Sequence, residues 1–179
     1  MLRCFLLLFL TLLVRPCFAH EAHVHGHVQL TLALEEQSGE MSLFSAQANF
    51  LPFEYVPQTS EEITQALALQ NKLAHPEELF VLSPEAVCNM QVKHLEGPAF
   101  TKQAGHHEEH GHEHGHGHEH ANIHMEIAVS CEKPEKLRGL RTTLFETFPA
   151  IREIALEVVG PFGQRAAKLE AKDPSVTWQ

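Results

Sequence analysis

Apolar and polar residues alternate in the segment that follows the first 19 residues. One set is apolar and falls on even-numbered positions: Val24, Val28, Leu30, Leu32 and Leu34. The positions between them are polar and begin with three histidines: His23, His25, His27, Gln29 and Thr31. A period of two is typical of a strand that is buried on one face. We therefore predict a strand whose outer face starts with a ladder of histidines, then a turn at residues 37–40 and a second strand at residues 41–50.

Two segments show the spacing of helices. Thr59 and Glu62 form a capping-box pattern, and the residues predicted to face inward after it are Ile63, Ala66, Leu67, Gln70 and Leu73. The second segment begins at Pro134 and ends before Pro149, with its inward positions at Leu137, Leu140, Leu144 and Phe148. We predict one helix in each segment.

Residues 88–95 and 124–131 are predicted to form an antiparallel hairpin in which the numbers of paired residues add up to 219. This register pairs Cys88 with Cys131 and aligns apolar residues, with His94 facing Met125 on the apolar side. On the other side it pairs Lys93 with Glu126. Cys88 and Cys131 are therefore predicted to form a disulfide, the alternative being two free buried cysteines.

The remaining segments complete the predicted fold. Residues 151–159 have the pattern of a strand, residues 160–163 that of a turn, and residues 175–179 are a plausible last extended piece. Residues 164–171 fit either an extended segment or a short helix. The order of these elements predicts an α+β fold: an antiparallel sheet with two helices packed on one face, and one long His-rich loop inserted in a hairpin.

Residues 1–19 have the features of a secretory signal peptide, with Arg3 ahead of an apolar stretch and Ala19 at the expected cleavage position. We expect residues 20–179 to form a single exported α+β domain; a membrane anchor is the alternative. No other apolar run reaches the length of a membrane span, so the domain is not expected to be membrane-embedded. The net charge of −10 argues against nucleic acid as a partner.

Histidine dominates the predicted chemistry, with 15 residues in the chain. Residues 96–123 form a His-rich insert whose centre, residues 105–120, has no apolar residue to bury, so we expect it to be flexible. Its candidate metal ligands are imidazoles: His106, His107, His110, His112, His114, His116, His118 and His120. Carboxylates between them can also ligate: Glu108, Glu109, Glu113 and Glu119. Such a set suits zinc, with several ions held weakly, although nickel and copper remain open.

A second candidate site lies at the start of the first predicted strand. His23, His25 and His27 recur at every second position, so their side chains would share a face, with His20 and Glu21 nearby; a solvated ladder without metal is the alternative. At the mouth of the insert, His124 is predicted to face outward and is the better ligand. His94 is predicted to be a core or rim residue.

These features do not favour an enzyme. Catalytic metal sites use a few fixed ligands, and a surplus of histidines in flexible chain does not preorganise a reaction. One enzymatic alternative is a copper site with His20 as the first residue after cleavage, which needs a fixed partner histidine.

The chain resembles the ZrgA-like family of periplasmic zinc-binding proteins over nearly all of residues 20–178. The matching features occur in order: the His25–Gly26–His27 opening, the loop from Asn49 through Glu54 to Pro57, Cys88 before a strand, the His-rich insert, Cys131 before Pro134, and Phe145 with Phe148–Pro149. Glu54 belongs to this pattern, and we interpret it as structural rather than as a ligand.

The resemblance implies zinc uptake: a periplasmic protein that binds zinc and supports a high-affinity import system. The implied partners are zinc ions and the solute-binding component of a zinc ABC transporter. The alternative is a periplasmic buffer, storage or detoxification protein for zinc, nickel or copper.

Overall fold

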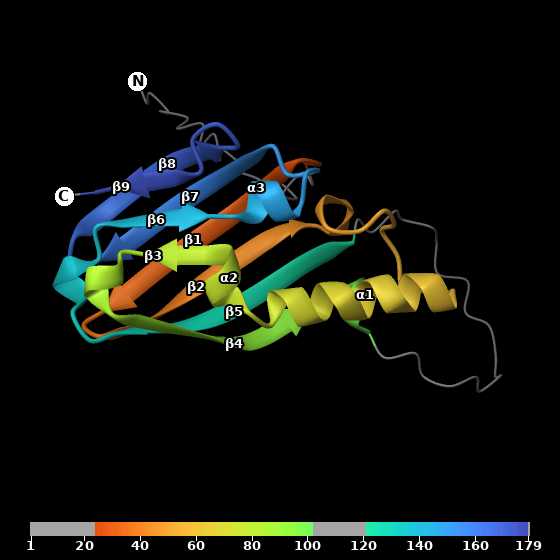
Figure 1. Ribbon diagram of the computed structural model, residues 1–179, viewed down its shortest axis with the longest axis horizontal. Coiled ribbons are helices and arrows are strands. Elements are labelled where there is room, and N and C mark those ends of the chain that lie inside the picture. The colour runs from red at the N-terminus through yellow and green to blue at the C-terminus, as the bar shows by residue number, and fades with distance from the viewer. Residues whose placement is uncertain (1–23, 102–120, 179) are drawn as a thin grey trace, which may run out of the picture.

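The computed structural model describes residues 24–101 and 121–178. Its main layer is a six-stranded, curved sheet that runs the length of the molecule (Figure 1). In spatial order the strands are β4 (Cys88–Glu96), β5 (Asn122–Cys131), β2 (Ser38–Ala46), β1 (His27–Glu35), β7 (Glu153–Gly160) and β8 (Gly163–Glu170).

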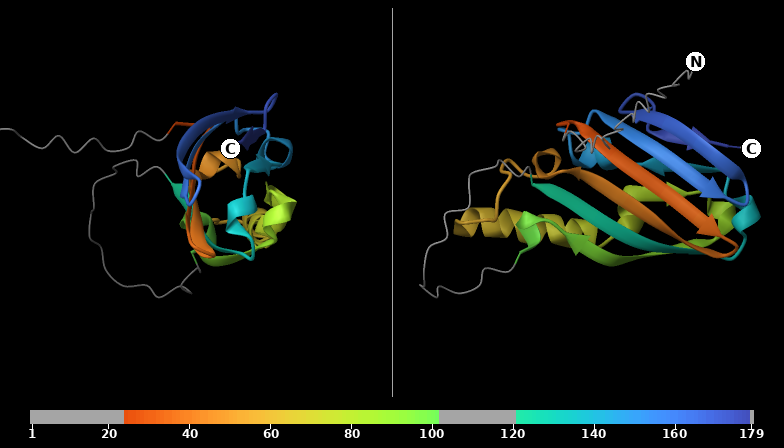
Figure 2. Two further views of the ribbon diagram at one scale, coloured as in Figure 1. Left: turned by 90° about the vertical axis from the view of Figure 1, so that its left-hand side faces the viewer. Right: turned by 180° about the vertical axis from the view of Figure 1, so that it is seen from behind.

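A second layer covers one face of this sheet. It contains a three-stranded sheet, in the order β3 (Phe80–Leu82), β6 (Gly139–Thr142) and β9 (Ser175–Thr177), together with α1 (Ser60–Leu73), α2 (Pro76–Leu79) and α3 (Leu144–Thr147). Figure 2 shows the two layers end-on and shows the other face of the large sheet from behind, where no described helix or strand covers it. The outer face is therefore the surface on which polar side chains of the large sheet are displayed.

The alternating pattern of β1 explains which face is covered. Val28, Leu30, Leu32 and Leu34 are buried in the core, as predicted, while the residues between them point to the outer face. Val24 is 56% exposed and lies before the strand, so the prediction that the core face begins there was wrong.

Helix α1 begins at the predicted capping box. The Thr59 hydroxyl accepts a hydrogen bond from the Glu62 backbone N–H, and the Glu62 carboxylate accepts one from the Thr59 backbone N–H. Its buried residues are Ala66, Leu69 and Leu73, whereas Leu67 is 59% exposed. The buried face of α1 is therefore displaced around the helix from the predicted one. Residues three or four positions apart lie on the same face of a helix, so Leu69 lies with Ala66 and Leu67 does not.

The predicted helix at residues 134–148 was wrong. This segment forms a 3-10 turn (Pro134–Lys136), strand β6 and the short helix α3. The four apolar residues predicted to face inward are nevertheless buried: Leu137, Leu140, Leu144 and Phe148. The strand requires Gly139, because a Cβ there would lie 2.6 Å from the Val176 carbonyl oxygen of β9.

The large sheet is mixed rather than wholly antiparallel, which corrects the predicted fold class. Strands β1 and β7 are parallel, while the other neighbouring pairs are antiparallel. The chain crosses the covered face through β6 and α3 before β7, and such a crossover is what a parallel pair needs. Residues 163–170 form strand β8, which resolves the two predicted alternatives in favour of the extended form.

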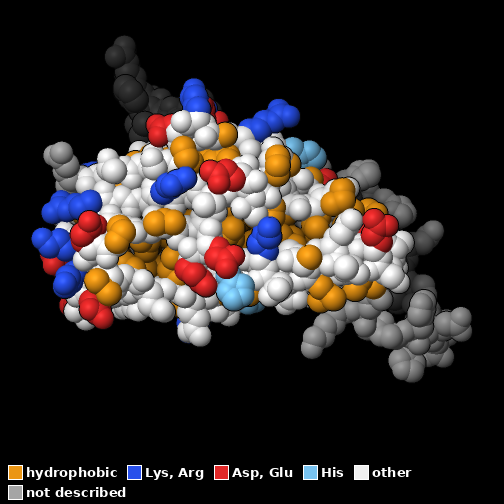
Figure 3. Space-filling model, in the orientation of Figure 1, with side chains coloured by type: hydrophobic (Ala, Val, Ile, Leu, Met, Phe, Trp, Pro, Cys, Tyr) orange, Lys and Arg blue, Asp and Glu red, His pale blue; other side chains and the backbone are white. Residues whose placement is uncertain are grey.

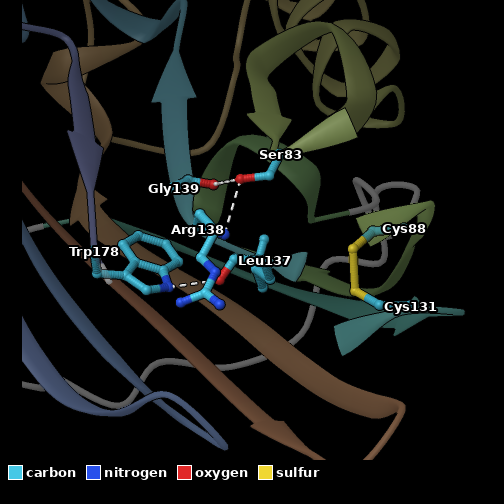
Figure 4. Close-up of a disulfide and its surroundings, with 7 residues drawn as sticks. All are labelled: Ser83, Cys88, Cys131, Leu137, Arg138, Gly139 and Trp178. Carbon is cyan, nitrogen blue, oxygen red and sulfur yellow. Dashed lines mark hydrogen bonds between the residues drawn. A yellow bond between two sulfur atoms is a disulfide. The ribbon is translucent and has the colours of Figure 1, made fainter. Parts of the chain in front are cut away.

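The hairpin of β4 and β5 confirms the predicted register from Cys88 to Val92, and Cys88 and Cys131 form a disulfide (Figure 4). The same close-up shows Trp178, whose indole N–H donates to the Leu137 carbonyl oxygen at 2.8 Å. The disulfide closes the end of the hairpin that is opposite to the long connection between the two strands.

Candidate metal centre

Both histidine-rich parts of the chain attach to one end of the large sheet. Ala46 of β2 pairs with Asn122, where β5 begins, and the neighbouring residue Ser45 pairs with Val28 of β1. Strand β4 ends beside the start of β5, since Glu96 pairs with His124. The first residues of β1 and both ends of the β4–β5 connection therefore lie together (Figure 1).

Most of the predicted ligands lie outside the described residues. These are the acidic and histidine residues of the insert and the first two histidines after the signal segment: His106, His107, Glu108, Glu109, His110, His112, Glu113, His114, His116, His118, Glu119, His120, His20 and His23. Within residues 24–101 and 121–178, no group of three or more His, Cys, Asp or Glu side chains is already spaced to hold a metal ion.

His25 and His27 do not form the predicted ladder. Strand β1 begins only at His27, and Gly26 turns the chain with a φ of +83°. The Nε2 atom of His25 lies 3.1 Å from the Glu54 carboxylate, whereas Nδ1 of His27 lies 3.6 Å from the carboxylate of Glu153 on β7. Each imidazole thus has its own carboxylate partner, and the described pair does not share one site.

Buried Asn49 fixes this turn. Its side-chain oxygen accepts a hydrogen bond from the Gly26 backbone N–H at 2.6 Å, and its amide nitrogen donates to the His27 carbonyl oxygen at 2.9 Å. Because unpaired buried amides are costly, these contacts hold the start of β1 in place. These hydrogen bonds give Asn49 a structural role in the loop from Asn49 to Pro57. The contact with His25 gives Glu54 a structural role in the same loop.

A β-bulge at Lys93 produces the largest departure from the predicted hairpin. After Val92 the register shifts by one residue, so that His94 pairs with Glu126 and Leu95 with Met125. The extra residue lets Val92 and Leu95, three positions apart, both pack against the core. It also turns His94 to the outer face, where its side chain is 50% exposed, so both its predicted core position and the predicted Lys93–Glu126 pair were wrong.

The shifted register brings two imidazoles to one carboxylate. Nε2 of His94 lies 3.0 Å from Oε2 of Glu96, and Nδ1 of His124 lies 3.2 Å from Oε1 of the same residue. We call His94, Glu96 and His124 the bulge cluster. His124 faces outward as predicted, while Glu96 was missed as a candidate. The signal in the sequence was the spacing of three positions between the apolar residues Val92 and Leu95, which breaks the period of two and indicates a bulge.

Hydrogen bonding within the bulge cluster changes the protonation of its members. The bond to Glu96 is the main cause that raises the pKa of His94. Hydrogen bonds from His94 and then His124 lower the pKa of Glu96 below its ordinary value. The cluster therefore presents negative charge and imidazole nitrogen together.

A comparison with protein-family models matches residues 22–178 to the description "ZrgA family zinc uptake protein". The chain belongs to this family. The match covers every described residue of the protein from Val24 onward, including the bulge cluster and the disulfide. A comparison with curated proteins gives no match.

The histidine-bearing end of the large sheet is the end where β1 and β5 begin. Figure 3 shows the covered face, where several Lys and Arg side chains gather at the opposite end of the molecule. Cationic side chains also lie where β1 begins, since Arg152 is close to Gly26 and Lys168 pairs with Glu153 beside His27. Among the described helices of this family member, none is long and apolar enough to cross a membrane.

Proposed function

We propose that this protein binds zinc in the periplasm and delivers it to a high-affinity zinc importer. The observation that carries the proposal is the attachment of both histidine-rich segments to one end of a single sheet. Membership of a zinc uptake family supports zinc as the cargo.

The chemistry of capture follows from the number of ligands. A single neutral imidazole binds zinc weakly, whereas several held on one chain bind well, because each bound ligand raises the effective concentration of the next. Eight histidines fall within residues 106–120, which is more than one tetrahedral ion needs. Several ions per molecule are therefore expected, each held weakly enough to be passed on.

The proposed location rests on two features. Residues 1–19 have the pattern of a cleavable export signal, and the disulfide between Cys88 and Cys131 suits an oxidising compartment. The partner that best fits delivery is the solute-binding component of a zinc ABC transporter, which would receive the ion in the same compartment.

Isothermal titration tests the capture step. The comparison is between the protein and a variant of equal length in which the eight histidines of residues 106–120 are replaced by serine. We expect the variant to bind fewer zinc ions, with no change in the far-ultraviolet circular dichroism spectrum. Equal zinc stoichiometry in both proteins would contradict the proposal that this segment captures zinc.

Growth experiments separate uptake from storage. A protein that supports import is needed when zinc is scarce, whereas a buffer or detoxification protein for zinc, nickel or copper is needed when metal is in excess. We expect a deletion strain to grow poorly in zinc-depleted medium and to recover with the intact gene. A defect that appears only at high metal would favour the storage function.

A further inference from the structure

We infer that His94, Glu96 and His124 form a zinc site of their own at the base of the histidine-rich connection. This inference rests on the proposed function, because it takes zinc as the cargo, and it adds an ordered site to it. The contacts that support it all belong to described residues on the outer face of the sheet.

The donor atoms suit zinc in kind and number. The bulge cluster offers two imidazole nitrogens and a carboxylate, and zinc binds ligands of both kinds at about 2.0–2.2 Å in tetrahedral geometry. Neighbouring donors in such a site lie roughly 3.3 Å apart. The two nitrogen–oxygen distances in the cluster, 3.0 and 3.2 Å, are already close to that separation.

Binding requires only side-chain rotation. The ring centroids of His94 and His124 are 6.5 Å apart, so His94 and Glu96 have to rotate toward His124 to share an ion with it. His94 and Glu96 are exposed at the sheet surface, the latter by 59% of its side chain, and both are free of core packing that would resist the rotation. The backbone positions need no change, since the strand register already places the three residues side by side.

The surroundings of His124 hold its ring in the orientation that a ligand needs. Its Nε2 atom lies 3.1 Å from the Ser42 hydroxyl and 4.0 Å from the Glu126 carboxylate, while Nδ1 faces Glu96. The ring of Phe44 packs edge-on at 6.4 Å. Zinc-binding histidines commonly use one nitrogen for the metal and donate the other N–H to a protein oxygen, and Ser42 and Glu126 offer that oxygen here.

His27 does not belong to this site. It lies on the same face of the sheet, but two strands away from His124 and two positions along, which places it about 12 Å away by strand geometry. Three protein ligands thus leave the fourth position of a zinc ion to water, and a partly exposed site of this kind exchanges its ion readily. The site is suited to holding zinc in transit between the histidine-rich segments and a receiving protein.

Carbethoxylation of histidines, read for each residue by mass spectrometry, tests the site in the full protein. Zinc-bound imidazole lacks a free nitrogen and reacts slowly, so saturating zinc should slow the modification of both His94 and His124 by at least about threefold. In Glu96→Gln, which keeps the size of the side chain, this protection should be lost at both histidines. His75 is the matched control. Like His94 with Glu96, it lies two positions before its carboxylate partner, Glu77, at 3.3 Å, and its side chain is about as exposed as that of His94. Unlike Glu96, Glu77 contacts no second described imidazole.

The outcomes separate this inference from the proposed function. If zinc protects histidines of residues 106–120 but leaves His94 and His124 as reactive as His75, the site is refuted while zinc capture stands. If no histidine is protected, both fail. Protection of His94 and His124 that persists in Glu96→Gln also overturns the site, since the carboxylate would then not be a ligand.

Discussion

The side-chain oxygen of Gln47 accepts a hydrogen bond from the backbone N–H of Ala99 at 3.0 Å, and this contact joins the turn that follows β2 to the start of the long connection. The backbone N–H of Gln47 donates to the Ala121 carbonyl oxygen at 2.8 Å, at the other end of that connection. The amide nitrogen of the same buried side chain donates to the carbonyl oxygens of Phe53 and Tyr55. One residue therefore fixes both ends of the histidine-rich connection and the loop that carries Glu54.

Replacing Gln47 by leucine should destabilise the protein. The substitution keeps the volume of the side chain but leaves the buried N–H of Ala99 without its acceptor, which costs about 1–3 kcal/mol. Urea denaturation followed by circular dichroism measures the loss. The matched control is Gln70→Leu on the exposed side of α1, which should change the free energy of unfolding by less than about 0.5 kcal/mol. Equal effects of the two substitutions would contradict the structural importance of Gln47.

Removing the disulfide should lower stability without changing zinc binding. Cys88 and Cys131 are separated by 43 positions, and closing a loop of that length restricts the unfolded chain by about 4 kcal/mol in the chain-entropy model. We expect the double variant Cys88→Ala, Cys131→Ala to lose about 2–4 kcal/mol of unfolding free energy. Zinc stoichiometry should stay the same, because the disulfide lies about 20–26 Å along the strand from the bulge cluster. Reduction of the native protein by dithiothreitol provides the control and should reproduce the loss.

The capping box makes the stability of α1 depend on pH. Hydrogen bonds from the Thr59 backbone N–H, the Tyr55 hydroxyl and the Gln58 backbone N–H lower the pKa of Glu62 from 4.5 to about 2. Because the folded pKa lies below the unfolded one, the stabilisation is fully present above about pH 4.5 and is lost as the pH falls toward 2.

Glu62→Gln removes this pH dependence while keeping a side chain that suits the capping box. We expect the variant to be less stable than the native protein at pH 6, and the difference to shrink between pH 4.5 and pH 2, as thermal unfolding at each pH will show. Glu61→Gln, one position earlier in the same turn, controls for the loss of a negative charge near the helix N-terminus. A difference that is constant down to pH 2 would disprove the role of the carboxylate.

Deleting Lys93 should be tolerated, because it is the extra residue of the bulge. The deletion leaves Val92 opposite Ile127 and His94 opposite Glu126 in an uninterrupted ladder. We expect a change in unfolding free energy below about 1 kcal/mol, with the zinc protection of His94 preserved. Deleting Gln91 instead moves Val92 away from the core face and should cost more, since partly buried apolar surface is lost. Equal losses for the two deletions would mean that Lys93 is not the bulged residue.

The sequence predicted those elements whose pattern is local. Alternation in β1, the Thr59–Glu62 capping box and the pairing of Cys88 with Cys131 each depend on neighbouring residues or on one short register, and each is confirmed. The helix predicted at residues 134–148 failed because its apolar spacing fits two solutions. The segment forms a strand because β9 pairs with it and approaches Gly139 closely. Strand β9 comes from a part of the chain far from this segment, so the local spacing does not reveal the contact.

The same limit applies to the candidate site. His124 was predicted to face outward because its parity in β5 follows from its buried neighbours Ile123 and Met125. The position of His94 depended on a bulge, and one extra residue reverses every following side chain. The pairing of His25 and His27 with separate carboxylates depended on Glu54 and Glu153, which come from distant parts of the chain and which spacing alone does not relate to them.

The position of the disulfide has a consequence for proteolysis. Strand β4, the connection, strand β5 and the Cys88–Cys131 bond form a closed covalent ring. A single peptide-bond cleavage between Thr101 and Ala121 opens that ring but separates nothing: the two fragments stay linked through sulfur and come apart in electrophoresis only after reduction. The part of the chain richest in metal ligands can therefore be nicked once without costing the molecule its covalent integrity.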